Sequence, residues 1–283
     1  MVDLHTHSFF SDGEASPEEL ALQAVRRNAV IALTDHNTVK GLPSFLDAGG
    51  YSEKLVAGIE FSTAVDGCSF HILGLFIDEK HFDETERLAS VFLKNKRESN
   101  ILLAENLKNA GFDVSYTEVE ALCPEGNVNR AAFAELLMNK GYISDIEEGI
   151  KGILSKERGY YIPPAKPDSR DVTEFLRGIN AVPVLAHPLC NHPFDKLLTI
   201  VPLLKKAGLA GIETIHSQYD PEQTAQAERL REKFSLLASG GSDFHGRRKP
   251  GISLFTGKGN LSVPDEYFIN LREFNLKQRK GLI

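Results

Sequence analysis

No stretch of this 283-residue sequence stays apolar over the length that a membrane-spanning segment needs. The first residues lack a basic stretch followed by an apolar run, so we expect no secretory signal. Cysteine is scarce as well, and Cys68, Cys123 and Cys190 are not in C-x-x-C spacing. This scarcity disfavours a disulfide framework and predicts a reduced, cytoplasmic setting. With no apolar span, we also expect no membrane partner.

Positive charge is not in excess either, since the formal net charge is -7. A negative balance disfavours nucleic acid held by bulk electrostatics, although a locally positive pocket could hold a nucleotide or a short oligonucleotide. Apolar residues, by contrast, make up 42% of the chain, which is ample for a packed interior. The length suits one large α/β domain or a core with an insertion, and nothing in the sequence indicates an obligate protein partner.

Expected strands and helices alternate along most of the chain. Short apolar runs predict strands at residues 1–7, 30–36, 54–65, 69–77, 181–188, 210–217 and 235–246. Amphipathic patterns predict helices at residues 19–29, 83–110, 195–208 and 221–234. Ser16, Pro17 and Glu19 have the spacing of a helix start, and Asp66-Gly67 is a hairpin signal. Repeated strand and helix units favour either a parallel barrel or a doubly wound sheet.

The alternation weakens between residues 111 and 166, where the pattern is mostly helical with loops. We therefore expect an inserted, mostly helical subdomain at residues 97–166. It would divide the main domain into a first part at residues 1–96 and a second part at residues 167–283.

Two histidines interrupt the first expected strand. Residues two apart in a strand point to the same face, so His5 and His7 converge, and Asp12 can return to them from the following turn. Such a pair can clamp a metal ion. For this motif alone, two hydrogen-bonded core histidines are the open alternative.

Other apolar strands carry the same kinds of side chain. Glu60 and His71 lie inside apolar strands, where an unpaired charge is costly. His36 and His187 lie at the ends of their strands, and Asp243 and His245 come in the loop part of residues 235–246, after the apolar run. Because the C-terminal ends of parallel strands build the active site of α/β folds, this convergence predicts a metal site. Nitrogen and oxygen ligands without thiolates suit Zn, Mn or Fe. The ligands are too many for one tetrahedral ion, which favours two or three divalent ions that share a carboxylate.

The motifs together resemble those of the PHP family, named for polymerase and histidinol phosphatase. The matching stretches are DLHTHSFFSDG, ALTDHNTVKG, GIEFS, FHILG, LAHP and GSDFH, between Val2 and about Gly246. The chain is most similar to a branch of metal-dependent phosphoesterases that includes tryptophan-operon-linked bacterial phosphoesterases and 3',5'-nucleotide bisphosphate phosphatases. The resemblance implies a distorted seven-stranded (β/α) barrel with an inserted helical subdomain.

The resemblance also implies how the ligands are shared. One ion would be held by His5, His7, Glu60 and Asp243. A second would be held by Asp12, His36 and His245, and a third by His71 and His187, with Glu60 as the bridge. Asp3 and Asp35 would orient the imidazoles from behind.

Substrate contacts are implied at three further positions. Arg130 matches the arginine of a G-R-P-H-x-A pattern in the insertion, although Ala132 stands where that pattern has histidine. His216 would contact the substrate phosphate or assist the leaving group, unless it is a rim histidine without a role. Arg247, with Arg248 and Lys249, would form a positive lip of a phosphate pocket, unless the three belong to a solvated charge run. We thus expect His216, Arg130 and Asp243 to be catalytic, with Arg130, His216 and Arg247 binding substrate.

The function implied is a metal-dependent phosphoesterase in which a metal-bridging hydroxide attacks phosphorus. Nucleoside mono- or 3',5'-bisphosphates and short oligonucleotides are the expected substrates. A histidinol-phosphatase-like enzyme is the nearest alternative. A non-catalytic, metal-stabilised module that binds nucleic acid and a C–N or C–O hydrolase are the other two.

Overall fold

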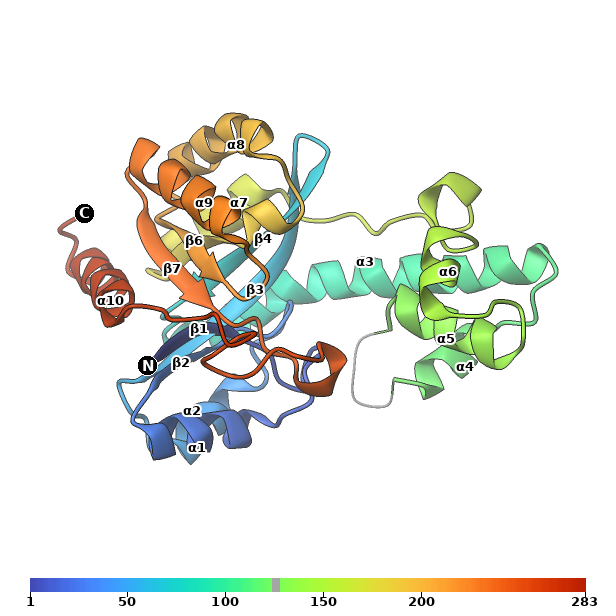
Figure 1. The fold of residues 1–283 in the computed structure, drawn as a ribbon, viewed down its shortest axis with the longest axis horizontal. Helices are drawn as coiled ribbons and strands as arrows, with labels where there is room; N and C mark the ends of the chain where they lie inside the picture. Colours follow the sequence, from blue (N-terminus) through green and yellow to red (C-terminus); the bar gives the residue numbers. More distant parts are fainter. Residues whose placement is uncertain (124–127) are drawn as a thin grey trace. The chain divides into compact units, whose positions relative to one another are not determined.

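The computed structural model describes residues 1–123 and 128–283. By its internal contacts the chain divides into two compact units, residues 1–89 with 167–283 and residues 90–166, here called the barrel unit and the inserted unit (Figure 1). The expected insertion at residues 97–166 includes residues 124–127, which lie outside the described part. Asn127 is among them, and it begins the segment at residues 127–142 that contains Arg130.

One seven-stranded sheet forms the barrel unit, with its strands neighbouring in chain order. They are β1 (Val2–Thr6), β2 (Val30–Leu33), β3 (Leu55–Val65), β4 (Cys68–Leu75), β5 (Val182–Ala186), β6 (Gly211–His216) and β7 (Leu237–Gly241). The Asp66-Gly67 turn makes β3 and β4 an antiparallel hairpin, as predicted, and β4 also pairs antiparallel with β5. The other neighbouring pairs are parallel.

The last strand returns to the first and nearly closes the sheet. Just beyond β7, the amide of Asp243 donates to the His5 carbonyl at 2.8 Å, and the amide of His7 donates to the Phe244 carbonyl at 3.0 Å. Gly241 permits this approach, because a Cβ there would lie 2.5 Å from the His5 backbone nitrogen. The prediction of a distorted seven-stranded barrel is confirmed.

Helices cover the outer face of the strands (Figure 1). They are α1 (Pro17–Arg27), α2 (Leu42–Ala48), α7 (Ser169–Gly178), α8 (Phe194–Lys206) and α9 (Pro221–Lys233), whereas α10 (Asp265–Arg279) packs against residues of the other face. The predicted capping box begins α1, with Ser16 accepting from the Glu19 amide and Glu19 accepting from the Ser16 amide. The sequence analysis did not identify α2, α7 or α10.

Two clusters of buried apolar residues lie on opposite faces of the strands. Along β2, Ile31 and Leu33 belong to one cluster, and Val30 and Ala32 belong to the other. The first cluster contains apolar residues of α1, α2, α7, α8 and α9, whereas the second contains Phe268 and Leu271 of α10. Burial on both faces explains why the strands read as continuous apolar runs.

The inserted unit is mostly helical. Helix α3 (Phe82–Asn109) begins in the barrel unit and continues into the inserted unit. It is followed there by α4 (Tyr116–Ala121), α5 (Arg130–Asn139) and α6 (Ile146–Lys151). The core of the inserted unit includes Leu103, Phe133 and Leu137, each fully buried. Within the described ranges, no helix is both long and apolar enough to cross a membrane.

Candidate metal centre

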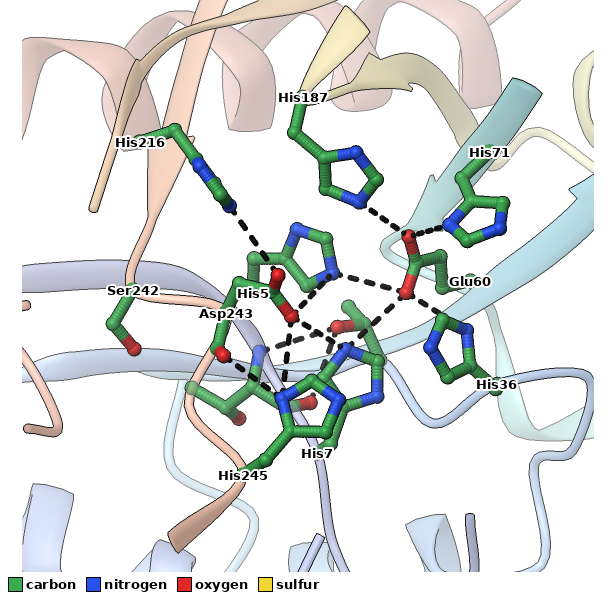
Figure 2. Close-up of polar contacts among 12 residues, drawn as sticks. His5, His7, His36, Glu60, His71, His187, His216, Ser242, Asp243 and His245 are labelled. Carbon is green, nitrogen blue, oxygen red and sulfur yellow. Dashed lines mark hydrogen bonds and ion pairs between the residues drawn. The ribbon is translucent and has the colours of Figure 1, made fainter. Parts of the chain in front are cut away.

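Nine histidine and carboxylate side chains gather at one end of the barrel, around the ends of its strands (Figure 2). They form four overlapping groups, and within each group one possible ligand atom per residue lies within 4.8 Å of those of the other members. The groups are His7, Asp12, His36 and His245; His5, Glu60 and His187; His5, His7 and Asp243; and His36, Glu60 and His71. Every residue that the sequence analysis proposed as a metal ligand is in at least one group. Six of the seven strands, or the loops that follow them, provide these residues.

Glu60 lies at the centre of this cluster, in β3, with its side chain fully buried. One carboxylate oxygen, Oε2, lies 3.1 Å from His5 Nε2, 3.2 Å from His7 Nε2 and 2.9 Å from His36 Nδ1. The other oxygen, Oε1, lies 2.7 Å from His71 Nδ1 and 2.9 Å from His187 Nε2. One carboxylate therefore faces five imidazoles, with different imidazoles on each oxygen, which is the placement that a bridging ligand needs.

Asp243 and Asp12 provide the other two carboxylates. Asp243 Oδ1 lies 3.3 Å from His7 Nε2 and 3.8 Å from His5 Nε2. Asp12 Oδ1 lies 3.1 Å from His245 Nε2 and 3.8 Å from His36 Nε2. Several imidazoles thus lie near two carboxylates: His5 and His7 are near both Glu60 and Asp243, and His36 is near both Glu60 and Asp12.

Most of the inward atoms lack hydrogen-bond partners. Six buried atoms of the cluster have none: His5 Nε2, His7 Nε2, Asp12 Oδ1, His36 Nδ1, Glu60 Oε2 and His245 Nε2. Leaving such atoms unsatisfied in a protein interior is costly, and divalent cations would satisfy them all. The nitrogen and oxygen donor set therefore fits divalent metal ions, which identifies these side chains as able to hold them.

The charge state of the cluster suits cations. Burial alone would raise the pKa of Glu60, but the charges on His36 and His5 outweigh it and hold that pKa well below its usual range. Burial lowers the pKa of His71 to about 4, so its imidazole is neutral at neutral pH and available as a ligand. Burial alone would lower the pKa of His5 and His7, but the neighbouring carboxylates outweigh it and raise both, that of His7 to about 9, so a metal ion would replace protons at these two rings.

Two of the proposed ligands have left-handed backbone conformations. His187 directly follows β5 with φ 29°, and Asp243 follows β7 with φ 56°. Such values cost energy in residues other than glycine and are common where a side chain must be aimed at a functional site. The chain turns sharply at both strand ends, at the points where it presents these two side chains.

Glu213, in β6, was missed by the sequence analysis. Its Oε1 lies 2.9 Å from His5 Nδ1, and its Oε2 accepts a hydrogen bond from the His187 amide at 2.6 Å. Burial alone would raise the pKa of Glu213, but His5 more than compensates and lowers it. The available signal was a glutamate inside the apolar strand GIETI, which is the same signal that identified Glu60.

Asp3 and Asp35 were expected to orient imidazoles, and Asp35 reaches one through Ser11, whose hydroxyl lies 3.5 Å from His7 Nδ1. Asp3 accepts hydrogen bonds from the backbone amides of Ser242 and Phe255. Asp35 accepts from Ser8 and from the Ser11 hydroxyl. Both stabilise the loops that carry ligands, and Glu213 is a carboxylate that contacts an imidazole from behind directly.

His216 lies behind Asp243 and is almost fully buried. Its Nε2 is 3.4 Å from Asp243 Oδ2, and its Nδ1 accepts a hydrogen bond from the Gln218 amide at 3.3 Å. Because Nδ1 accepts, the ring proton of the neutral form is on Nε2 and points at Asp243. The side chain therefore lies against Asp243, and its expected contact with substrate stays a prediction.

Lys249, and not Arg247, faces the cluster from the loop after β7. Lys249 Nζ lies 2.6 Å from Asp243 Oδ2 and lines the hollow above the ligands. Burial alone would lower the pKa of Lys249, but Asp243 more than offsets it and raises the pKa. Arg247 is exposed and pairs with Glu14, and its expected contact with substrate stays a prediction.

Arg130 belongs to the inserted unit, where it begins α5. Its guanidinium lies 4.7 Å from the centre of the Tyr161 ring and donates to the Leu154 carbonyl at 3.4 Å. Ala132, at the position of the missing histidine, is buried in the core of this unit. The expected contact of Arg130 with substrate stays a prediction.

Fold and site are those of a metal-dependent hydrolase, with a seven-stranded barrel that gathers histidines and carboxylates at its strand ends. The chain belongs to the PHP domain family, whose model matches residues 3–162. The family assignment made from the sequence is confirmed, and with it the class of enzyme, a phosphoesterase.

Similar proteins support this assignment over most of the chain. A 5'-3' exoribonuclease of Haemophilus influenzae is 31% identical over 247 residues, which cover 86% of this chain and 89% of the relative. A 3',5'-nucleoside bisphosphate phosphatase of Chromobacterium violaceum is 28% identical over 255 residues, which cover 86% of this chain and 87% of the relative. A solved structure from Bifidobacterium adolescentis, whose proposed activity is that of a metal-dependent phosphoesterase, has a TM-score of 0.78 and 25% identity, with 96% of each chain covered.

Proposed function

We propose that this protein hydrolyses phosphate esters of nucleotides at a centre of two or three divalent ions, with Zn, Mn or Fe as the candidates. The observation that carries the proposal is Glu60, a buried carboxylate facing five imidazoles, surrounded by ligand atoms without hydrogen-bond partners. Similarity to an exoribonuclease and a nucleoside bisphosphate phosphatase supports nucleoside mono- or 3',5'-bisphosphates and short oligonucleotides as substrates.

The proposed metal centre uses all nine clustered side chains as ligands. Nine side chains hold the ions: His5, His7, Asp12, His36, Glu60, His71, His187, Asp243 and His245. Glu60 is shared between ions, because its two oxygens face different imidazoles. When bound, ions of this kind activate water and neutralise charge on a phosphoryl group.

Three residues outside the ligand set assist. Glu213 fixes the His5 ring so that Nε2 points inward, and His216 holds Asp243 from behind. Lys249 brings a positive charge to the rim of the hollow, where a phosphate oxygen can take the place of the Asp243 oxygen it now contacts. Arg130 remains a second proposed phosphate anchor, because an arginine can bind phosphate through two parallel hydrogen bonds.

The test on metal-loaded protein measures the release of inorganic phosphate and, for the oligoribonucleotide, the release of nucleoside monophosphates as well. Substrates should include adenosine 5'-monophosphate, adenosine 3',5'-bisphosphate, a short oligoribonucleotide and histidinol phosphate. We expect metal-dependent turnover of at least one nucleotide substrate above that of histidinol phosphate. A preference for histidinol phosphate would favour the nearest alternative, and release from none of them would favour a non-catalytic module.

A cytoplasmic location is part of the proposal and rests on the scarcity of cysteine. The complete set of ligand types disfavours a non-catalytic module, since such a module has no need to keep nine convergent ligands.

A further inference from the structure

A second hollow adjoins the one above the ligand cluster, and both lie in the barrel unit. The near hollow is lined by His36, His71, His187, Cys190, Asn191, Gln218, Asp243 and Lys249. The far hollow is lined by Ser69, Phe70, His71, Ala186, His187, Pro188, Asn191 and His192. His71, His187 and Asn191 line both, so the two hollows adjoin along these residues, and together they are here called the groove.

The two ends of this groove differ in charge. The near end has the Asp243 carboxylate and the Lys249 ammonium group, 2.6 Å apart. Among the described residues that line the far end, none is an aspartate, glutamate, lysine or arginine. A molecule lying along the groove would therefore place a charged group at the near end and an uncharged, partly aromatic group at the far end.

His192 gives the far end a fixed aromatic surface. Its Nε2 is 2.7 Å from the Ser69 carbonyl oxygen, and its ring centre is 4.2 Å from that of the buried Phe70, at an interplanar angle of 30°. A carbonyl oxygen can only accept, so the ring proton is on Nε2 and Nδ1 remains an acceptor. A ring held by a hydrogen bond and by a neighbouring ring loses little freedom when a ligand stacks on it.

We propose that the far hollow is the nucleoside-binding subsite of this enzyme, with the base stacking on His192 and Asn191 offering amide hydrogen bonds. The inference rests on the proposed function, because it takes the phosphate of the same substrate to be held at the metal ligands. Every nucleobase has a flat π surface, so stacking alone tolerates different bases. The subsite would thus select nucleotides over phosphate esters without a base, and would discriminate weakly among bases.

The test compares adenosine 5'-monophosphate with ribose 5-phosphate, which differ by the base alone, in metal-loaded protein. We expect wild-type kcat/KM to be higher for the nucleotide, and His192→Ala to lower that preference about ten-fold, mainly through KM. His192→Phe keeps an aromatic ring and should retain most of the preference. The control is His81→Ala, since His81 pairs with Glu84 and lines neither hollow.

Two results would overturn the subsite. One is a wild-type enzyme that does not distinguish the two substrates, and the other is an unchanged preference in His192→Ala. If neither substrate is hydrolysed, the proposed function is in question, and calorimetry with adenosine still tests the subsite. Weaker adenosine binding by His192→Ala than by His81→Ala would then support the subsite, and equal binding would overturn it.

Discussion

Glu213 and His5 are joined across the barrel by a contact of 2.9 Å between Oε1 and Nδ1, and both side chains are fully buried. The contact fixes which imidazole nitrogen carries the proton, and leaves His5 Nε2 free to face Glu60. The same carboxylate accepts a hydrogen bond from the His187 amide, so the Glu213 side chain aligns two proposed ligands. A carboxylate behind a histidine ligand also makes the imidazole a stronger donor.

Glu213→Gln should therefore weaken metal binding without unfolding the barrel. The amide keeps the shape of the side chain but loses the charge opposite His5. We expect metal affinity to fall by about 10- to 100-fold, measured by competition with a chelator. An affinity equal to that of the wild type would show that Glu213 does not act through His5.

Glu60→Gln should have a larger effect, because Glu60 faces five imidazoles. We expect loss of bound metal together with loss of phosphate release, while the circular dichroism spectrum stays close to that of the wild type. Elemental analysis and the phosphate assay on one preparation measure both. Glu84→Gln is the matched control, since Glu84 pairs with His81 away from the cluster. Near-normal metal content and rate in Glu60→Gln would mean that Glu60 is not the bridge.

Lys249 and Arg247 give a comparison within one short segment. Lys249→Met removes the cation beside Asp243, and Arg247→Met removes one that is exposed and paired with Glu14. We expect KM for nucleotide substrates to rise about ten-fold or more in Lys249→Met, because hydrogen bonds between charged groups are strong. Arg247→Met should leave KM within about two-fold, in line with the small worth of exposed ion pairs. The reverse pattern would support Arg247 as the phosphate contact.

Arg130→Ala tests whether the inserted unit takes part in substrate binding. A group that holds the phosphate equally in ground state and transition state changes KM and not the chemical step. We expect KM to rise by a factor equivalent to about 1.5–3 kcal/mol, with metal content unaffected. Unchanged KM and kcat on both a nucleoside monophosphate and a 3',5'-bisphosphate would exclude Arg130 from the site.

The strand pattern and the histidine motifs made much of the barrel predictable. The His5 and His7 pair and the Asp66-Gly67 turn are local signals, because strand period and turn chemistry act over a few residues. Helices such as α2 and α7 were missed, since they are short and flank more conspicuous motifs.

The roles of Glu213 and Lys249 could not be predicted in the same way. Glu213 contacts His5 across 208 positions of sequence, and only the closed barrel brings them together. Arg247 and Lys249 are two residues apart in one charged run, and the backbone of the short helical turn at Gly246–Arg248 decides which of them faces the cluster. Side-chain direction in such a loop has no period that can be read from the sequence.

The most direct test of the central claim is to count metal ions and phosphate release in the same sample. Protein purified without chelators should contain two or three divalent ions per chain by elemental analysis. Removing them with a chelator should abolish phosphate release from nucleotides, and adding back Zn, Mn or Fe should restore it. One ion or none per chain, or phosphate release that survives complete metal removal, would contradict the account.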